Sequence, residues 1–185
     1  MNRRSRLPVR DLAALLSNSM HLIGGASEGI ADHLAQTVAE LGRLDFWNLG
    51  MRPGKQANGF GETDGCAILV LPRNPVAAAA GLAIIGCAII NRGRGRSIDL
   101  LFPTLPVAGE LQKAVGKTHL VMSRLSVNAA TGNSEIEPLH NQSSASYHSL
   151  ATSEVFVVLQ PEQSIVNRGE FAEYVPIWNQ ELLAK

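Results

Sequence analysis

The first residues able to do chemistry lie in the stretch HLIGGASEGIADH. Gly24 and Gly25 carry no Cβ atom, so the backbone can approach a ligand closely there, and Ser27 can cap a following helix. Asp32 follows soon after, where its carboxylate could hold a cation or position a ligand group. An ordinary strand-to-helix loop uses the same glycines and serine without any ligand. This stretch therefore becomes informative only together with others.

A second stretch, MRPGKQANGFG, brings two cations together. Pro53 and Gly54 predict a turn that projects Lys55, and Arg52 comes just before that turn. Two positive charges on one turn suit a phosphate or another oxyanion, to which they donate charge-assisted hydrogen bonds. A solvent-exposed basic loop is the alternative interpretation.

The third stretch, VLPRNPVAAAAG, predicts a strand end, a tight corner and the start of a helix. After Pro72 and Arg73, Asn74 stands at the expected N-cap, and Pro75 stands at the first helical position, where a missing N–H costs nothing. The free N–H groups of such a helix start and the helix dipole favour an anion. We expect this corner and the Gly24–Gly25 corner to share one edge of a parallel sheet, because ligands bind outside the carboxyl ends of strands.

The elements that must position these residues alternate along the first half of the chain. Helices are expected at residues 10–19, 26–42 and 75–90, and strands at residues 20–23, 44–51 and 65–71. This alternation predicts an α/β domain, with a mostly parallel sheet covered by helices.

The second half changes to strands separated by turns. Strands are expected at residues 119–127, 134–139, 154–160 and 170–177. A stretch rich in glycine, proline and arginine separates the two textures and marks a linker at residues 99–105. We therefore expect a partial α/β domain over residues 1–98, a small β-rich domain over 106–178 and a tail at 179–185.

Composition limits the function classes. The 185 residues are 45% hydrophobic and 17% charged, which is typical of a globular protein. Lysine plus arginine equals aspartate plus glutamate at 16 each, so no net field favours nucleic acid, and we expect no nucleic-acid partner. Cys66 and Cys87 have no metal-type spacing and lie in apolar runs, which predicts buried thiols in a reducing cytoplasm. The histidines form no ligand spacing with cysteine and no Ser–His–Asp arrangement.

The apolar run at residues 75–90 raises the question of a membrane. A spanning helix needs roughly 20 apolar residues, and this run is shorter, bounded by Pro75 and Asn91. We expect no membrane span and interpret the run as a helix buried in a domain core or in a dimer interface.

Taken in order, GGASEGIADH, MRPGKQ and LPRNPVAA resemble the successive motifs SGGVSVGxxD, xKPGKP and LPGNPVS of the molybdenum insertases. These are the MoeA and gephyrin E-domain proteins, or molybdopterin molybdenumtransferases. GKTHLVMSRLSV, EIEPLHNQSSASYHSLATSEVFVVLQPE and VNRGEFAEYVPI resemble the β-rich C-terminal domain of that family. The resemblance covers nearly the whole chain but only the C-terminal portion of a family member. The family's N-terminal domains and the first strand–helix unit of its ligand-binding domain are expected to be absent.

The resemblance implies a role in molybdenum cofactor biosynthesis. Family members bind adenylylated molybdopterin and molybdate, cleave the adenylate in a step that needs a divalent cation such as Mg²⁺, and release the cofactor. The resemblance also implies a cytoplasmic dimer, with molybdopterin adenylyltransferase as a further partner. Asp32 and Lys55 would be the catalytic residues, with Asp32 also the metal ligand. The ligand crevice would use Gly24, Gly25, Ser27, Pro53, Gly54, Pro72, Arg73, Asn74 and Pro75.

Several positions depart from the family motifs. Ile23 replaces a serine, Arg73 replaces the glycine of LPGNP and Gln56 replaces the last proline of PGKP. Met122 stands where an arginine is expected, although Arg124 is kept. Two alternatives to an enzyme therefore stand: a non-catalytic binding or scaffold module, or a remnant of a split gene that a second polypeptide completes.

Overall fold

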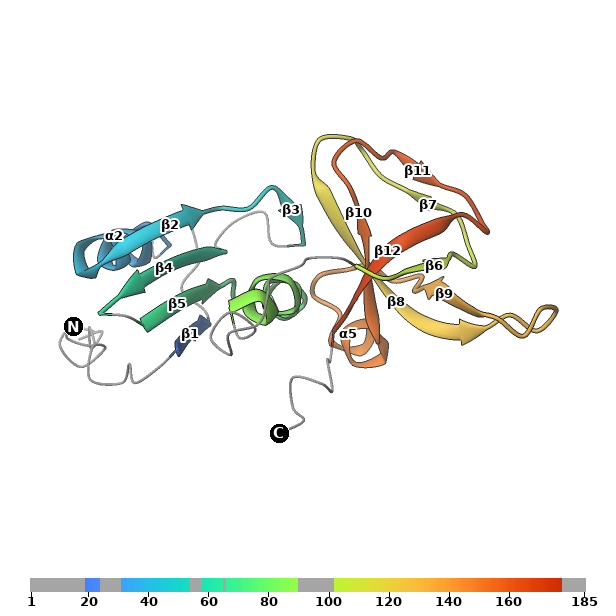
Figure 1. Ribbon diagram of the computed structural model, residues 1–185, viewed down its shortest axis with the longest axis horizontal. Coiled ribbons are helices and arrows are strands. Elements are labelled where there is room, and N and C mark those ends of the chain that lie inside the picture. The colour runs from blue at the N-terminus through green and yellow to red at the C-terminus, as the bar shows by residue number, and fades with distance from the viewer. Residues whose placement is uncertain (1–18, 24–30, 54–57, 65, 90–101, 178–185) are drawn as a thin grey trace, which may run out of the picture.

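A computed structural model describes residues 19–23, 31–53, 58–64, 66–89 and 102–177 of the chain. Within these residues the protein is β-rich, with mixed sheets and few helices (Figure 1). The elements of the first half are β1 (Ser19–Ile23), α2 (Ala31–Leu41), β2 (Arg43–Trp47), β3 (Met51–Arg52), β4 (Gly59–Thr63), β5 (Cys66–Leu71), α3 (Pro75–Gly81) and the π-helix η1 (Leu82–Gly86). Of the helix predicted over residues 10–19, residues 10–18 lie outside the described residues, and Ser19 begins β1 instead.

The sheet of the first half has the strand order β1-β5-β4-β2. β1 pairs with β5 in parallel, whereas β4 pairs antiparallel with both β5 and β2. The prediction of a mostly parallel sheet is therefore wrong for these pairings. The reason is a hairpin: Asp64 adopts a positive φ of 48° and turns β4 back along β5, with Thr63 opposite Cys66.

Helices cover both faces of this sheet. Successive side chains of β5 point to opposite faces, so each helix packs on alternate residues of this strand. Ile68 and Val70 pack with Val38 of α2 on one face. On the other face, Leu69 and Leu71 pack with Ile85 of η1. A strand buried on both faces reads as a continuous apolar run, which explains the sequence CAILVL.

The apolar run after Pro75 forms a helix that continues through η1 to residue 89. Its prediction as a helix with little exposure is confirmed, apart from Leu82, which is 37% exposed. Val76, Ala80 and Ala83 are at most 3% exposed and pack into a cluster with strands of the second half. The helix thus lies between the two sheets, as the green ribbon in Figure 1 shows.

The second half contains a larger sheet of order β3-β8-β10-β12-β6, with β9 pairing to β8, and a two-stranded sheet of β11 and β7. Its elements are β6 (Thr104–Pro106), β7 (Leu111–Gln112), β8 (Thr118–Val127), β9 (Ser134–Pro138), α5 (Tyr147–Thr152), β10 (Val155–Leu159), β11 (Ile165–Val166) and β12 (Phe171–Pro176). All five residues of β10 are buried. Val155, Val157 and Leu159 pack into a core made only of second-half residues, whereas Phe156 and Val158 face the cluster that contains α3.

The two halves share structure beyond the segment that joins them. β3 belongs to the first half of the sequence, yet it pairs in parallel with β8, with Met51 opposite Thr118 and Arg52 opposite His119. Met51 is 4% exposed and joins the same cluster as Phe156. The two sheets stay separate, but one strand and one helix of the first half complete the core of the second.

Candidate functional site

One edge of the first sheet brings together the ends of the segments that carry the sequence motifs. Ile23, the last residue of β1, is the register partner of Leu71, the last residue of β5. Both strand-to-helix corners therefore leave the sheet at the same edge, as expected. Gly59, which begins β4, pairs with Val70, so the chain also enters β4 at this edge of the sheet.

The corner after β5 has the predicted local geometry. The side chain of Asn74 accepts a hydrogen bond from Ala77 N at 3.1 Å, and Pro75 is the first residue of α3. Ala78 N donates to Asn74 O at 2.8 Å, which closes the first helical turn. Asn74 is thus the N-cap, and its amide oxygen satisfies a helix N–H that would otherwise need water or a ligand.

The side chains at this corner point in different directions. Pro72 is buried, Asn74 and Pro75 are half-buried, and Arg73 is exposed. The family glycine at the Arg73 position is thus replaced by a side chain that reaches solvent.

The other predicted site residues are only partly covered by the structure. Asp32 is the second residue of α2, but only its backbone belongs to the described part. Pro53 is half-buried and directly follows β3. The remaining predicted residues lie outside the described residues: Gly24, Gly25, Ser27, Gly54 and Lys55.

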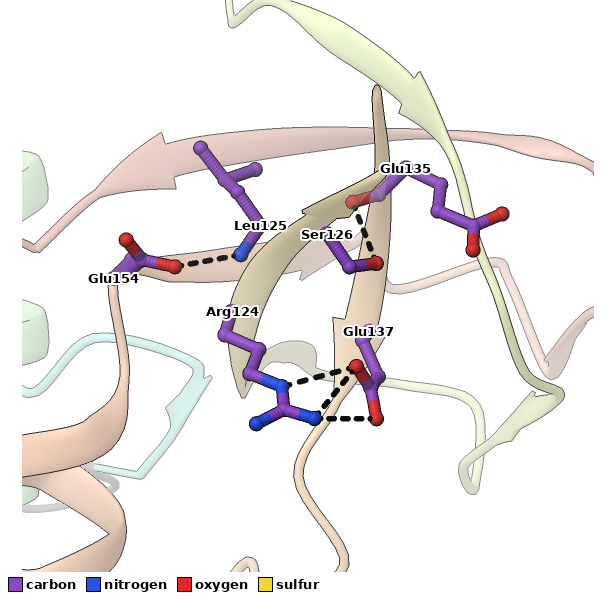
Figure 2. A network of polar contacts seen from close by, with 6 residues as sticks. All are labelled: Arg124, Leu125, Ser126, Glu135, Glu137 and Glu154. Carbon is purple, nitrogen blue, oxygen red and sulfur yellow. Dashed lines mark hydrogen bonds and ion pairs between the residues drawn. The ribbon is translucent and has the colours of Figure 1, made fainter. Parts of the chain in front are cut away.

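Met122 and Arg124, at the departure from the family motif in β8, lie in opposite environments. Met122 is 1% exposed and belongs to the cluster between the two halves. Arg124 is exposed and forms a two-point ion pair with its cross-strand partner: Nε lies 2.9 Å from Glu137 Oε2 and Nη2 lies 3.0 Å from Oε1 (Figure 2). The guanidinium of Arg124 is therefore already engaged by a carboxylate.

The stretch HNQSSAS is fixed to the back of the same strand. Gln142 accepts a hydrogen bond from Met122 N at 2.9 Å and donates one to Met122 O, also at 2.9 Å. Its amide nitrogen also donates to Leu139 O at 2.6 Å. These bonds pair the backbone of Met122 on the side of β8 where β9 has already ended at Pro138, so the loop stabilises the strand whatever it binds.

A group of cations that the sequence analysis did not assemble lines a cavity of about 430 Å³. The cations are Arg52, Lys113 and Lys117, and His119 lies beside them. Burial lowers the pKa of His119, and the nearby charges of Arg52 and Lys113 lower it further. The sequence signal was the pair of lysines around the Val115–Gly116 turn before β8, but their neighbour Arg52 comes from a distant segment.

The described residues offer little for metal or membrane chemistry. Among them, no group of three or more histidine, cysteine, aspartate or glutamate side chains could hold a metal ion. No helix in this part of the chain has both the length and the apolar character to cross a membrane. Cys66 is buried and Cys87 is half-buried, and burial raises the pKa of the Cys87 thiol.

Comparison with known proteins agrees with the motifs. Residues 104–177 match the family described as the MoeA C-terminal region (domain IV). The chain is 27% identical over 155 residues to the molybdopterin molybdenumtransferase of Haemophilus influenzae, covering 83% of this chain and 38% of that protein. It is 23% identical over 158 residues to molybdopterin molybdenumtransferase 1 of Mycobacterium tuberculosis, covering 82% of this chain and 37% of the relative.

Solved structures give the same fold. A molybdopterin biosynthesis MoeA protein from Pyrococcus horikoshii superimposes with a TM-score of 0.71 at 18% identity, covering 92% of this chain and 40% of that one. A molybdenum cofactor biosynthesis protein from Pyrococcus furiosus gives a TM-score of 0.59 at 13% identity, covering 93% of this chain and 76% of that one. The chain spans less than two fifths of the length of the two curated relatives named above. The resemblance expected from the sequence is confirmed: residues 104–177 match the MoeA C-terminal region, and the chain is similar to the C-terminal portion of proteins named as molybdopterin molybdenumtransferases.

Proposed function

We propose that this chain acts in molybdenum cofactor biosynthesis as the C-terminal part of a molybdopterin molybdenumtransferase, inserting molybdate into adenylylated molybdopterin. The names of its relatives support the class of reaction. The observation that carries the site is the register of Ile23 with Leu71, which starts both motif-bearing corners at one edge of the sheet. Open α/β sheets bind ligands at such an edge.

The proposed site uses backbone groups and a lysine side chain to hold the phosphates of the substrate. Gly24 and Gly25 would let the backbone approach, with Ser27 beside them, and the corner at Pro72 would frame the other side. Lys55, on its turn with Pro53 and Gly54, would place a point charge where negative charge builds up as the adenylate is cleaved.

Magnesium enters the proposal only through Asp32. The described residues supply no cluster of three or more ligands that fits a metal ion. The part proposed for the chain's own residues is phosphate binding and charge stabilisation. A carboxylate at the start of α2 would suit an oxygen-preferring cation at the same edge.

The Arg73→Gly variant restores the glycine of the family motif and tests whether the arginine affects ligand binding. Because its side chain is exposed, Arg73→Gly should change ligand affinity little. A change of tenfold or more on titration with a pyrophosphate-containing ligand would show that the arginine reaches the ligand.

The organisation proposed from the sequence extends to domains and assembly. Residues 1–98 would form the partial α/β molybdopterin-binding part and residues 106–178 the β-rich part. The linker would be 99–105 and the tail 179–185. A homodimer, molybdopterin adenylyltransferase as a partner and a cytoplasmic location complete the proposal. The helix at residues 75–89 is covered by the chain's own sheets, so a dimer contact must use another surface.

The deciding experiment separates binding from turnover. The purified chain is titrated with adenylylated molybdopterin, molybdate and Mg²⁺, while binding, AMP release and cofactor formation are each measured. Lys55→Ala should weaken ligand binding by roughly 1.5–3 kcal/mol, the value of a charge-assisted hydrogen bond. Lys185→Ala, which removes the same charge at the end of the chain, is the matched control and should bind normally.

Each outcome of this experiment favours one of the functional hypotheses. AMP release together with cofactor formation supports the enzyme. Binding without turnover favours the non-catalytic module that the motif departures suggest. Turnover that appears only when the N-terminal part of the Haemophilus influenzae relative is added favours a site completed by a second polypeptide. No binding of adenylylated molybdopterin contradicts the proposal.

A further inference from the structure

The basic cavity beside β8 is built by two distant segments of the chain. Parallel pairing of β3 with β8 places Arg52 opposite His119. The turn between β7 and β8 contributes Lys113 and Lys117, and Gln112, Ala114, Val115 and Gly116 complete the lining. Arg52 is exposed, whereas both lysines and His119 are half-buried. The cavity volume of about 430 Å³ falls in the range of small-molecule sites.

The turn that carries the lysines is held in place by backbone contacts. Gly116 N donates to Pro161 O at 2.8 Å, and Lys113 N donates to Ser164 O at 2.9 Å. Gly116 has a φ of 103°, a left-handed conformation that glycine adopts without strain. The lysine side chains therefore start from a fixed backbone rather than from a free loop.

The positive charge of the cavity is not balanced by its own lining. None of the lining residues carries a carboxylate. Within the described residues, neither Arg52 nor Lys113 forms an ion pair, whereas Arg43 and Arg124 each do. Lys113 Nζ donates to Pro161 O at 3.2 Å and to Ala114 O at 3.4 Å, which uses two of its three N–H groups.

The pKa of His119 also reflects the excess of positive charge in the cavity. Burial is the largest cause that lowers its pKa, and the positive charges of Arg52 and Lys113 add to it. The lowered pKa favours the neutral imidazole, which can donate one hydrogen bond without adding a charge to the site.

We propose that this cavity binds a tetrahedral oxyanion, supplied either as free inorganic phosphate or as the phosphate group of a phosphomonoester. The guanidinium of Arg52 can engage two oxygens side by side, and the two lysines add compact charges from the other wall. Arg52 comes from the stretch MRPGKQ, which also carries residues of the proposed insertion site, whereas Lys113, Lys117 and His119 come from outside the three motif stretches. Loss of phosphate binding in Lys117→Gln with molybdenum insertion unchanged would therefore distinguish this proposal from the proposed function.

The binding test uses two probes and matched variants. The full chain is titrated by calorimetry with inorganic phosphate and, separately, with AMP at low ionic strength. Arg52→Gln and Lys117→Gln should each weaken binding by roughly tenfold or more. Arg168→Gln, which removes an exposed charge from a loop outside the cavity, should leave binding unchanged. The same phosphate and AMP affinities would identify a free oxyanion as the ligand, whereas tighter AMP binding would identify a phosphomonoester.

The imidazole of His119 gives an independent readout by NMR. A bound anion favours the protonated imidazole, so phosphate should raise the pKa of His119. The charged groups that face the ring are Arg52 from β3 and Lys113 and Lys117 from the turn before β8. No saturable binding of either probe would overturn the proposal. Binding that weakens equally in Arg168→Gln and leaves the His119 signal unmoved would also overturn it.

Discussion

The central strands of the two sheets, β5 and β10, are both apolar and buried, but their faces are covered in different ways. β5 needs a helix on each side: α2 over Ile68 and Val70, and the helix after Pro75 over Leu69 and Leu71. β10 is covered by residues of the first half on one face only. On its other face, Val155, Val157 and Leu159 are covered by strands and turns of the same half.

The helix at residues 75–89 therefore packs against both sheets. It completes the first sheet through Ile85 and the second through Val76, Ala80 and Ala83. The helix belongs to the first half of the sequence, yet it buries Phe156 of the second half. We therefore expect damage on the shared face to be felt in both halves, and damage on the inner face of β10 to be felt locally.

The largest expected effect follows truncation of Phe156, which has no exposed surface. Phe156→Ala should lower the free energy of unfolding by about 3–5 kcal/mol, because it leaves a cavity in the shared cluster. Urea unfolding followed by the fluorescence of Trp47, in a Trp178→Phe background, would report the effect in the first half. An unchanged urea midpoint of the Trp47 signal would contradict the expectation that both halves depend on the shared cluster.

A double-mutant cycle sharpens this result. Phe156→Ala and Val76→Ala belong to one cluster, so their effects should deviate from additivity by about 0.5–3 kcal/mol. Ile136→Ala, in the cluster on the far face, is the control and should combine additively with Val76→Ala. Equal coupling in both cycles would contradict the division into a shared face and a private face.

The second prediction compares two glycines on the shared helix. A Cβ at Gly81 would lie 2.3 Å from Asn58 Oδ1 and 2.8 Å from Leu71 Cδ2, both in the interior. A Cβ at Gly86 would lie 2.6 Å from Cδ1 of Leu82, the flexible end of an exposed side chain. Despite a gain in helix propensity of about 1 kcal/mol, Gly81→Ala should destabilise by about 1–3 kcal/mol in urea unfolding. Gly86→Ala should be close to neutral, and the opposite ranking would refute this packing.

The third prediction compares the helix caps of the two halves. Asn74 caps α3 by accepting from Ala77 N, and Ser146 caps α5 by accepting from Ser149 N, each at 3.1 Å. Asn74→Ala and Ser146→Ala should each cost about 1 kcal/mol of stability. Amide hydrogen exchange should show the loss of protection at Ala77 in the first variant and at Ser149 in the second. Unchanged exchange at both amides would remove the capping role.

The smallest effect should come from the ion pair on β8 and β9 (Figure 2). The side chains of Arg124 and Glu137 are 54% and 41% exposed, so water and salt screen their attraction. A cycle of Arg124→Gln and Glu137→Gln should give a coupling below about 1 kcal/mol that shrinks as salt is added. A larger coupling that resists salt would mean that the pair is shielded from solvent.

Much of the fold could be predicted from local patterns. Strands expected at residues 119–127, 154–160 and 170–177 correspond closely to β8, β10 and β12. The Asn74 cap and the buried helix were also predictable, because caps and apolar runs act over a few residues. The pairing of strands was less accessible: no strand was expected at residues 59–63, where two of the five residues are glycine, a residue depleted in strands. The Asp64–Gly65 pair that follows is a typical hairpin signal.

The candidate sites divide in the same way. The shared edge at Ile23 and Leu71 followed from the alternation of strands and helices. The basic cavity did not, because Arg52 meets Lys113 only through the pairing of the two-residue strand β3 with β8. So short a strand has no periodicity to detect, and its partner is chosen by tertiary packing.

The burial of Met51 and the shared helix also matter to anyone who expresses part of this gene. A fragment limited to the recognised family region, residues 104–177, would expose the apolar face formed by Leu120, Met122, Phe156 and Val158. Such a fragment should bind hydrophobic dyes and be recovered from inclusion bodies unless its design retains β3 and the helix after Pro75. We therefore expect the smallest fragment that stays soluble to be longer than the family region at residues 104–177.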